Sequence, residues 1–166
     1  MQQKTSNGCT LIDRFSLTER IAMRVCWCGF VAVGTYAIFK QAPAWAVIYI
    51  VFSLSAFALV VLPGLCAHCP YPSKHSTCLF LPPELVNRFY PYKSPHMRPA
   101  AKIAVFAAMA VMVIMPQFWL LEDLPMLALF WLLGAPLLVL FPTHYCRRCR
   151  HFECPLNKAD TQDLTI

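Results

Sequence analysis

Two Cys-x-x-Cys motifs, 80 positions apart, are the part of this sequence most clearly equipped for chemistry. The first motif begins at Cys66 and the second at Cys146, and each directly follows a long apolar segment. Each motif is accompanied by a third cysteine and by histidines. The residues of the two clusters are Cys66, His68, Cys69, His75 and Cys78 in the first, and His144, Cys146, Cys149, His151 and Cys154 in the second.

These residue types and spacings are typical of metal ligands. A Cys-x-x-Cys turn brings two thiolates to one ion, and four thiolate or imidazole ligands close a tetrahedral zinc site. Each cluster holds enough ligands for a site of its own, and the third cysteines favour two sites over one that both motifs share. Zinc is the expected metal. An iron–sulfur cluster or mononuclear iron is the alternative, since prolines follow Cys69 and Cys154 as they follow ligand cysteines in ferredoxin-type runs.

The cysteines could also serve three roles besides metal binding. Structural disulfides are disfavoured because both clusters are expected on the reducing side of a membrane. Arg147 and Arg148 would stabilise a thiolate at Cys149, as in a thiol–disulfide oxidoreductase, although basic residues at that place also fit the membrane topology. Cys26 and Cys28 lie within the first apolar segment, where thiolates could relay a soft metal. Residues two apart do not share a helix face, however, and cysteine is also an ordinary small apolar residue.

The elements that must position the clusters are long apolar helices. The chain is 58% hydrophobic and only 13% charged, whereas about a quarter of the residues in a soluble domain are charged. A membrane-spanning helix needs about 20 mostly apolar residues. Four segments meet this requirement: Ile21–Phe39, Ala44–Leu62, Ile103–Leu121 and Leu124–Phe141. The sequence therefore predicts an all-α, polytopic membrane protein with four transmembrane helices.

Short polar turns divide these four helices into two helical hairpins within a single membrane domain. One turn lies near 41–43 and the other near 122–125. Local signals add a capping box at Ser16 and Glu19, which would begin the first helix. They also predict a short helix over Pro83–Tyr90, which would either lie on the membrane interface or pack against a partner. The expected order is an arm at 1–15, hairpin one at 16–62, a Cys/His loop at 63–99, hairpin two at 100–143 and a Cys-rich tail at 144–166.

The distribution of basic residues predicts the orientation in the membrane. The net charge is +6, and the lysines and arginines gather before the first helix, in the central loop and after the fourth helix. Only Lys40 lies on the other side, beside Glu122 and Asp123. Since basic loops stay in the cytoplasm, both termini and both clusters are expected there, in the plasma membrane of a bacterium. The positive face would attract anionic lipid, but the chain has no dedicated basic domain for nucleic acid.

These features predict an integral membrane, metal-binding accessory or anchor subunit of a larger complex, such as an electron-transfer complex. Its partners would be the lipid bilayer and other subunits that dock on the cytoplasmic face, where Phe80–Tyr92 would meet a soluble partner. The alternatives are an iron–sulfur electron carrier, a membrane thiol–disulfide oxidoreductase and a soft-metal transporter. No residue is assigned a catalytic role, so a non-catalytic or electron-transfer subunit is favoured over an independent enzyme.

Overall fold

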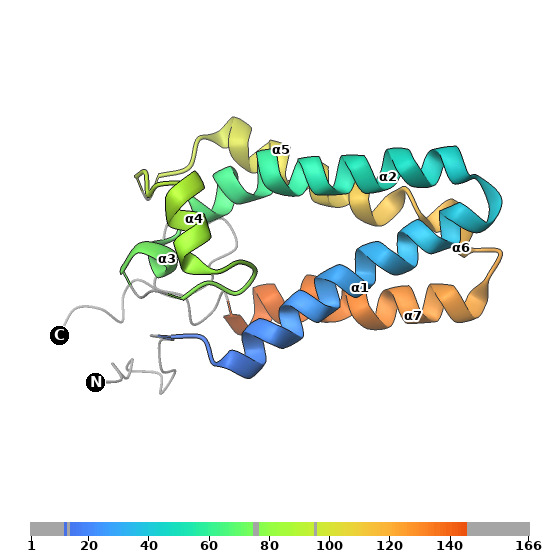
Figure 1. The fold of residues 1–166 in the computed structure, drawn as a ribbon, viewed down its shortest axis with the longest axis horizontal. Helices are drawn as coiled ribbons and strands as arrows, with labels where there is room; N and C mark the ends of the chain where they lie inside the picture. Colours follow the sequence, from blue (N-terminus) through green and yellow to red (C-terminus); the bar gives the residue numbers. More distant parts are fainter. Residues whose placement is uncertain (1–11, 13, 75–76, 95, 146–166) are drawn as a thin grey trace.

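Four long helices lie side by side in the computed structural model, which describes residues 12, 14–74, 77–94 and 96–145 (Figure 1). All the regular elements in these ranges are helical. Four helices are long and apolar enough to cross a membrane: Leu17–Gln41, Pro43–Cys66, Pro99–Leu120 and Leu124–Tyr145. They overlap the four predicted segments, which confirms the prediction of an all-α protein with four helices of membrane-spanning length.

Three of the four long helices either change helix type or are interrupted along their length. Helix α1 is continuous, whereas α2 and α7 each pass into a π-helix and α5 is followed by a short separate turn. The bounds are α1 Leu17–Gln41, α2 Pro43–Ala56 with η1 Phe57–Cys66, α5 Pro99–Ile114 with α6 Gln117–Leu120, and α7 Leu124–Ala135 with η2 Pro136–Tyr145. Prolines accompany these changes, because a proline has no N–H to continue the α-helical hydrogen bonds.

Helix α1 is packed against both α2 and α7, and α5 is packed against η1. The rings of Phe30 and Phe130 lie 4.3 Å apart where α1 meets α7. At the contact of α1 with α2, a side chain at Gly34 would place its Cβ 3.0 Å from the Tyr49 hydroxyl. The contact of Phe30 with Phe130 joins the two halves of the chain, and the division into two hairpins stays a prediction.

Two tyrosine hydroxyls donate to backbone carbonyls whose helical partner would be a proline, which has no N–H to donate. Tyr49 donates to the carbonyl of Met112 at 3.0 Å, and the α-helical partner of that carbonyl would be Pro116, four residues on. Tyr90 donates to the carbonyl of Ala58 at 2.6 Å. In a π-helix, whose bonds span five residues, the partner of Ala58 would be Pro63. Since lipid offers no donors, such carbonyls need partners within the protein.

The end of the molecule away from the first cysteine cluster is held by an ion pair between the two turns. Lys40 Nζ lies 2.9 Å from Asp123 Oδ2, and the other carboxylate oxygen accepts from the Met126 N–H at the start of α7. The Lys40 ammonium lowers the pKa of Asp123, and the Met126 N–H adds to this effect. Trp45 and Trp119 lie 6.3 Å apart near this end, as expected for aromatic side chains at a membrane interface.

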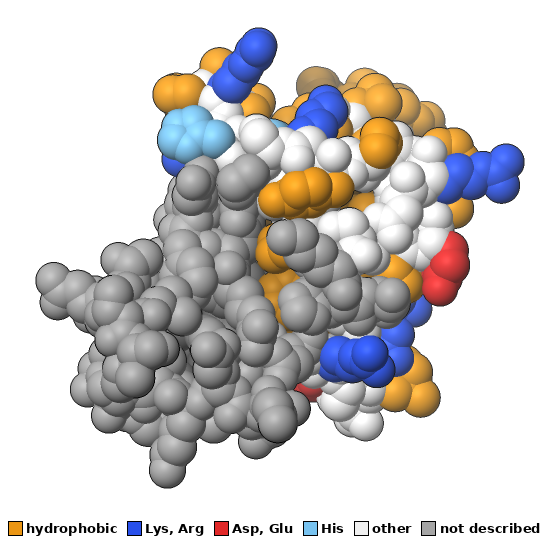
Figure 2. Space-filling model, turned by 90° about the vertical axis from the view of Figure 1, so that its left-hand side faces the viewer, with side chains coloured by type: hydrophobic (Ala, Val, Ile, Leu, Met, Phe, Trp, Pro, Cys, Tyr) orange, Lys and Arg blue, Asp and Glu red, His pale blue; other side chains and the backbone are white. Residues whose placement is uncertain are grey.

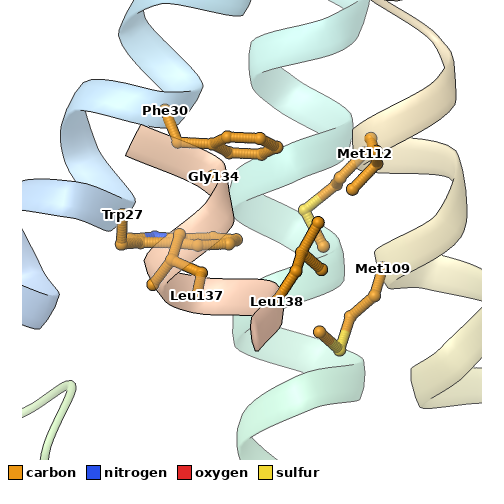
Figure 3. A pocket seen from close by; sticks show the side chains of 8 residues that line it. Trp27, Phe30, Met109, Met112, Gly134, Leu137 and Leu138 are labelled. Carbon is orange, nitrogen blue, oxygen red and sulfur yellow. The ribbon is translucent and has the colours of Figure 1, made fainter. Parts of the chain in front are cut away.

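A small cavity of about 30 Å³ lies between α1, α5 and the junction of α7 with η2 (Figure 3). The surface of the cavity is apolar throughout, so it offers no hydrogen-bond partner to a water molecule. The lining consists of Trp27, Phe30, Met109, Met112, Val113, Gly134, Leu137 and Leu138.

Local signals in the sequence are confirmed at two further places. The Ser16 hydroxyl accepts from the Glu19 N–H, and the Glu19 carboxylate accepts from the Ser16 N–H at 2.7 Å, which is the predicted capping box. The short helix expected over Pro83–Tyr90 is present as α4, Pro83–Phe89. Before it, α3 covers Pro70–Lys74.

Candidate metal site

The first cysteine cluster lies where the second long helix ends. Cys66 is the last residue of η1, and His68 and Cys69 follow in a turn before α3 begins at Pro70. The Cys69 N–H donates to the Cys66 carbonyl at 3.2 Å, so the Cys-x-x-Cys segment forms a tight turn. This is the local geometry that lets two nearby thiolates reach one ion.

Cys78 follows Cys66 by twelve residues in the sequence and lies beside it at the end of η1. The Cys66 thiol donates a hydrogen bond to Cys78, and this bond is the main reason that the pKa of Cys78 is lowered to about 6. The backbone N–H groups of Leu81 and Phe80 and the positive charge of Arg24 act in the same direction, against the effect of burial. The hydrogen bond and the nearby positive charge therefore favour the thiolate form of Cys78, which is the form that binds metal ions and attacks disulfides.

Cys69 and His68 lie at the edge of this thiol pair. Cys69 is close enough to Cys66 to interact with it electrostatically. The His68 Nδ1 lies 2.5 Å from the Ser94 carbonyl, and since a carbonyl only accepts, Nδ1 carries the proton. In the neutral imidazole, Nε2 then keeps its lone pair. Histidines that bind metals through one nitrogen commonly donate from the other to a backbone carbonyl in this way.

The described residues contain no group of three His, Cys, Asp or Glu side chains close enough together to hold a metal ion. Cys66 and Cys78 are instead hydrogen-bonded to each other. His144 lies exposed near the end of η2, with its ring 5.2 Å from that of Tyr145. The remaining predicted ligands lie outside the described residues: His75, Cys146, Cys149, His151 and Cys154. The choice between one shared site and two sites stays a prediction.

Phe15 brings the flanks of the two clusters together. Its ring lies 4.9 Å from Tyr71, two residues after Cys69, and 6.0 Å from Tyr145, which directly precedes Cys146. The Tyr71 hydroxyl also donates to the carbonyl of Ile12 at 2.7 Å. The segment before α1 thus joins the first cluster to the end of η2. No sequence motif points to Phe15, because its contacts lie far from it along the chain.

Two arginines of α1 add positive charge to this end of the molecule. Arg20 and Arg24 are one turn apart on α1 and half-buried, and the Nε of each is buried without a hydrogen-bond partner in the part of the chain that the structure describes. Arg24 is close enough to Cys78 to affect its pKa. In the sequence, their position near a helix end indicated only the orientation in the membrane. The fold adds that Arg24 lies close enough to the Cys78 thiol to affect it.

Comparison with known proteins adds no assignment. No protein-family model matches the chain, and no curated protein or solved structure gives a significant match.

Proposed function

We propose that this protein is an integral membrane subunit that binds metal through Cys/His ligands on the cytoplasmic face and anchors partner subunits of a larger complex there. The observation that carries the proposal is the contact between Cys66 and Cys78 at the end of a membrane-spanning helix, beside the turned Cys69. Cys78 from the loop lies beside Cys66 at the helix end, and Cys69 follows in the adjoining turn. That arrangement suits a metal that fastens a loop to a helix.

The donor set supports zinc at the first cluster. Cys66, Cys69 and Cys78 would supply three thiolates, and the Nε2 of His68 would complete a tetrahedral shell. Three thiolates exceed the charge of one divalent ion by one, and the nearby Arg24 would offset this excess. Metal binding can supply much of the energy that orders a segment without a large core of its own, such as this loop. The second cluster would form its own site beside the first, since Phe15 contacts the flanks of both.

The cytoplasmic placement is supported by the charges and by the thiols. The chain has 14 lysines and arginines, and apart from Lys40 they flank the cluster end of the helices. A reducing compartment would also keep free cysteines available for metal. In this orientation the metal-ordered loop and tail would face other subunits of a membrane complex, such as an electron-transfer complex.

Metal analysis of the full chain tests the proposal directly. Protein purified in detergent without chelators is expected to contain about one or two zinc ions per chain, as its two ligand sets allow. Replacement of both Cys66 and Cys69 by serine should remove one of them, whereas the matched pair Cys26→Ser and Cys28→Ser should leave the metal content unchanged. A brown protein whose absorption bleaches on reduction would identify an iron–sulfur cluster instead. Protein with neither zinc nor iron would refute the proposal.

One observation favours a second candidate, a thiol–disulfide oxidoreductase. A thiolate at Cys78 beside the Cys66 thiol could attack a substrate disulfide, after which Cys66 would resolve the mixed disulfide. The two thiols would lose two electrons and two protons, and the substrate disulfide would gain them. Because Cys78 is only 6% exposed, the reagent must be small, and in this case iodoacetamide should modify Cys78 without any chelator. Under the metal hypothesis, labelling of Cys78 should require prior removal of the metal.

A further inference from the structure

Helix α4 presents two apolar side chains away from the protein that supports it. Leu85 and Phe89, one turn apart, are 43% and 63% exposed, whereas Val86 is buried and Pro83 lies beside it in the interior. Figure 1 shows α4 crosswise to the long helices at the end where η1 stops. A helix in this position lies roughly parallel to the plane of a membrane that the long helices cross.

Hydrogen bonds fix the depth of α4 relative to the membrane-spanning helix beside it. The Tyr90 hydroxyl at the end of α4 reaches the Ala58 carbonyl, eight residues before Cys66, where the span ends. At a rise of about 1.5 Å per residue or less, this is up to about 12 Å along the helix. The end of α4 must lie within one tyrosine side chain of the Ala58 carbonyl, which places it beside the last turns of η1.

Two more contacts show that the loop folds back along η1. The rings of Phe80 and Phe57 lie 6.1 Å apart, and Phe57 is the first residue of η1. The Asn87 amide donates to the Pro72 carbonyl at 2.9 Å, which ties α4 to α3. The Tyr90 bond is also specific, because it satisfies the carbonyl that Pro63 leaves without a partner. The position of α4 is therefore determined by contacts of its loop with the long apolar helix that ends in η1.

Basic side chains surround this part of the molecule. Arg88 and Lys93 are exposed on and just after α4, and Arg98 is exposed at the start of α5. Figure 2 views this end of the molecule and shows Lys and Arg side chains at several points around its edge, with apolar side chains beside them. An apolar stripe at headgroup depth, flanked by positive charge, is the pattern of a helix that lies in the membrane interface.

We propose that α4 lies in the headgroup zone of the bilayer, with Leu85 and Phe89 inserted between acyl chains and Arg88 paired with the phosphate of an anionic lipid. Of the two surroundings that the sequence left open for this helix, the membrane interface and a partner, the inference selects the membrane. Leu59, next to Ala58 in η1, is 73% exposed, so the spanning helix also presents an apolar side chain close to the Tyr90 contact. The inference concerns lipid alone and does not depend on metal at the cysteines.

Quenching by brominated lipid tests the depth of the apolar stripe. Phe89→Trp and the matched control Glu84→Trp would each be placed in the full chain, in nanodiscs whose lipids carry bromine close to the glycerol. The difference spectrum against the parent protein isolates the new tryptophan from the four native ones. Tryptophan at position 89 should emit at shorter wavelength and lose most of its emission to bromine, whereas tryptophan at 84 should lose little. Leu85→Trp repeats the test if the first variant does not fold.

Emission from position 89 that is quenched by acrylamide in the water and not by brominated lipid would overturn the inference and return α4 to a soluble partner. The anionic-lipid contact has its own test, in which native mass spectrometry measures bound phosphatidylglycerol against phosphatidylcholine. Arg88→Gln should lower this preference about fivefold, the effect of one basic residue near a charged surface, and Arg88→Lys should restore it. An unchanged preference in Arg88→Gln would refute the role of Arg88. Zinc content measured on the same samples separates either failure from a failure of the metal proposal.

Discussion

Gly64 is the position at which a single added methyl group should disturb the molecule most clearly. It is buried in η1 where this helix meets α5, and a Cβ added there would lie 2.6 Å from Cγ2 of Val105. Carbon atoms in favourable contact lie about 3.5–4.0 Å apart, so the overlap is about 1 Å. Val105 is buried and β-branched, and a β-branched side chain in a helix has essentially one rotamer, so it cannot turn away.

The expected cost follows from two opposing effects. Overpacking of this kind costs about 1–3 kcal/mol, while alanine is favoured over glycine within a helix by up to about 1 kcal/mol. Gly64→Ala should therefore lower the free energy of unfolding by up to about 2 kcal/mol. For a chain of this size, about 2–4 °C in Tm corresponds to each kcal/mol, which thermal unfolding in detergent can resolve through tryptophan fluorescence.

A double-mutant cycle tests the contact between positions 64 and 105. Val105→Ala alone should destabilise the protein, because it leaves a cavity, but in the Gly64→Ala background it should be neutral or stabilising, because it removes the overlapping methyl group. Gly29→Ala is the matched control. Its Cβ would lie 3.0 Å from the end of the flexible Leu133 side chain, which can move away. If Gly64→Ala melts at or above the parent temperature, or if Val105→Ala costs the same in both backgrounds, the close contact of η1 with α5 is wrong.

Three further perturbations test the contacts at other parts of the fold. Tyr49→Phe and Tyr90→Phe each leave a carbonyl without its donor, so each should cost about 1–3 kcal/mol in thermal unfolding, whereas the exposed Tyr36→Phe should cost little. Asp123→Asn removes the partner of Lys40. The pKa of Asp123 is lowered in the folded protein. Its stabilising effect should therefore be full above its ordinary pKa of about 3.9 and be lost as the pH falls through the lower folded value. The Tm difference between parent and variant should be constant near neutrality and disappear in acid. Ser16→Ala should weaken the capping box by about 1 kcal/mol and speed amide hydrogen exchange in the first turn of α1, and Thr18→Ala should not.

The sequence was sufficient for the helices because their signals are local. Length and apolarity identify a spanning segment whatever surrounds it, and Ser16 with Glu19 needs no tertiary contact to begin α1. The helix neighbours could not be predicted in the same way. In a membrane, both lipid-facing and protein-facing surfaces are apolar, so the pattern of hydrophobic residues does not reveal which face packs. The fit of Gly34 to Tyr49 depends on shape, which only the assembled helices define.

The same difference between local and long-range features applies to the candidate site. The Cys-x-x-Cys turn at Cys66 is local and was predicted, whereas the features that define its chemistry come from elsewhere in the chain. Arg24 approaches Cys78 from α1, and the partner of His68 is Ser94, 26 residues away. Asp123 shows the same limit at the other end of the molecule, since the sequence placed it near Lys40 without showing that the two would pair at 2.9 Å.

The position of Gly64, two residues before Cys66, connects the packing of the helices to the proposed metal. If the overlap with Val105 moves the end of η1 away from α5, Cys66 moves with it, while Cys78 is held by the loop that contacts Phe57 and Ala58 further along the helix. The distance between the two thiols should then change, and a tetrahedral site tolerates little change in ligand position. Gly64→Ala should therefore release zinc to a chelator faster than the parent protein, and Gly29→Ala should not. Equal release from Gly64→Ala and the parent, in protein shown to bind zinc, would mean that the metal does not depend on where η1 ends.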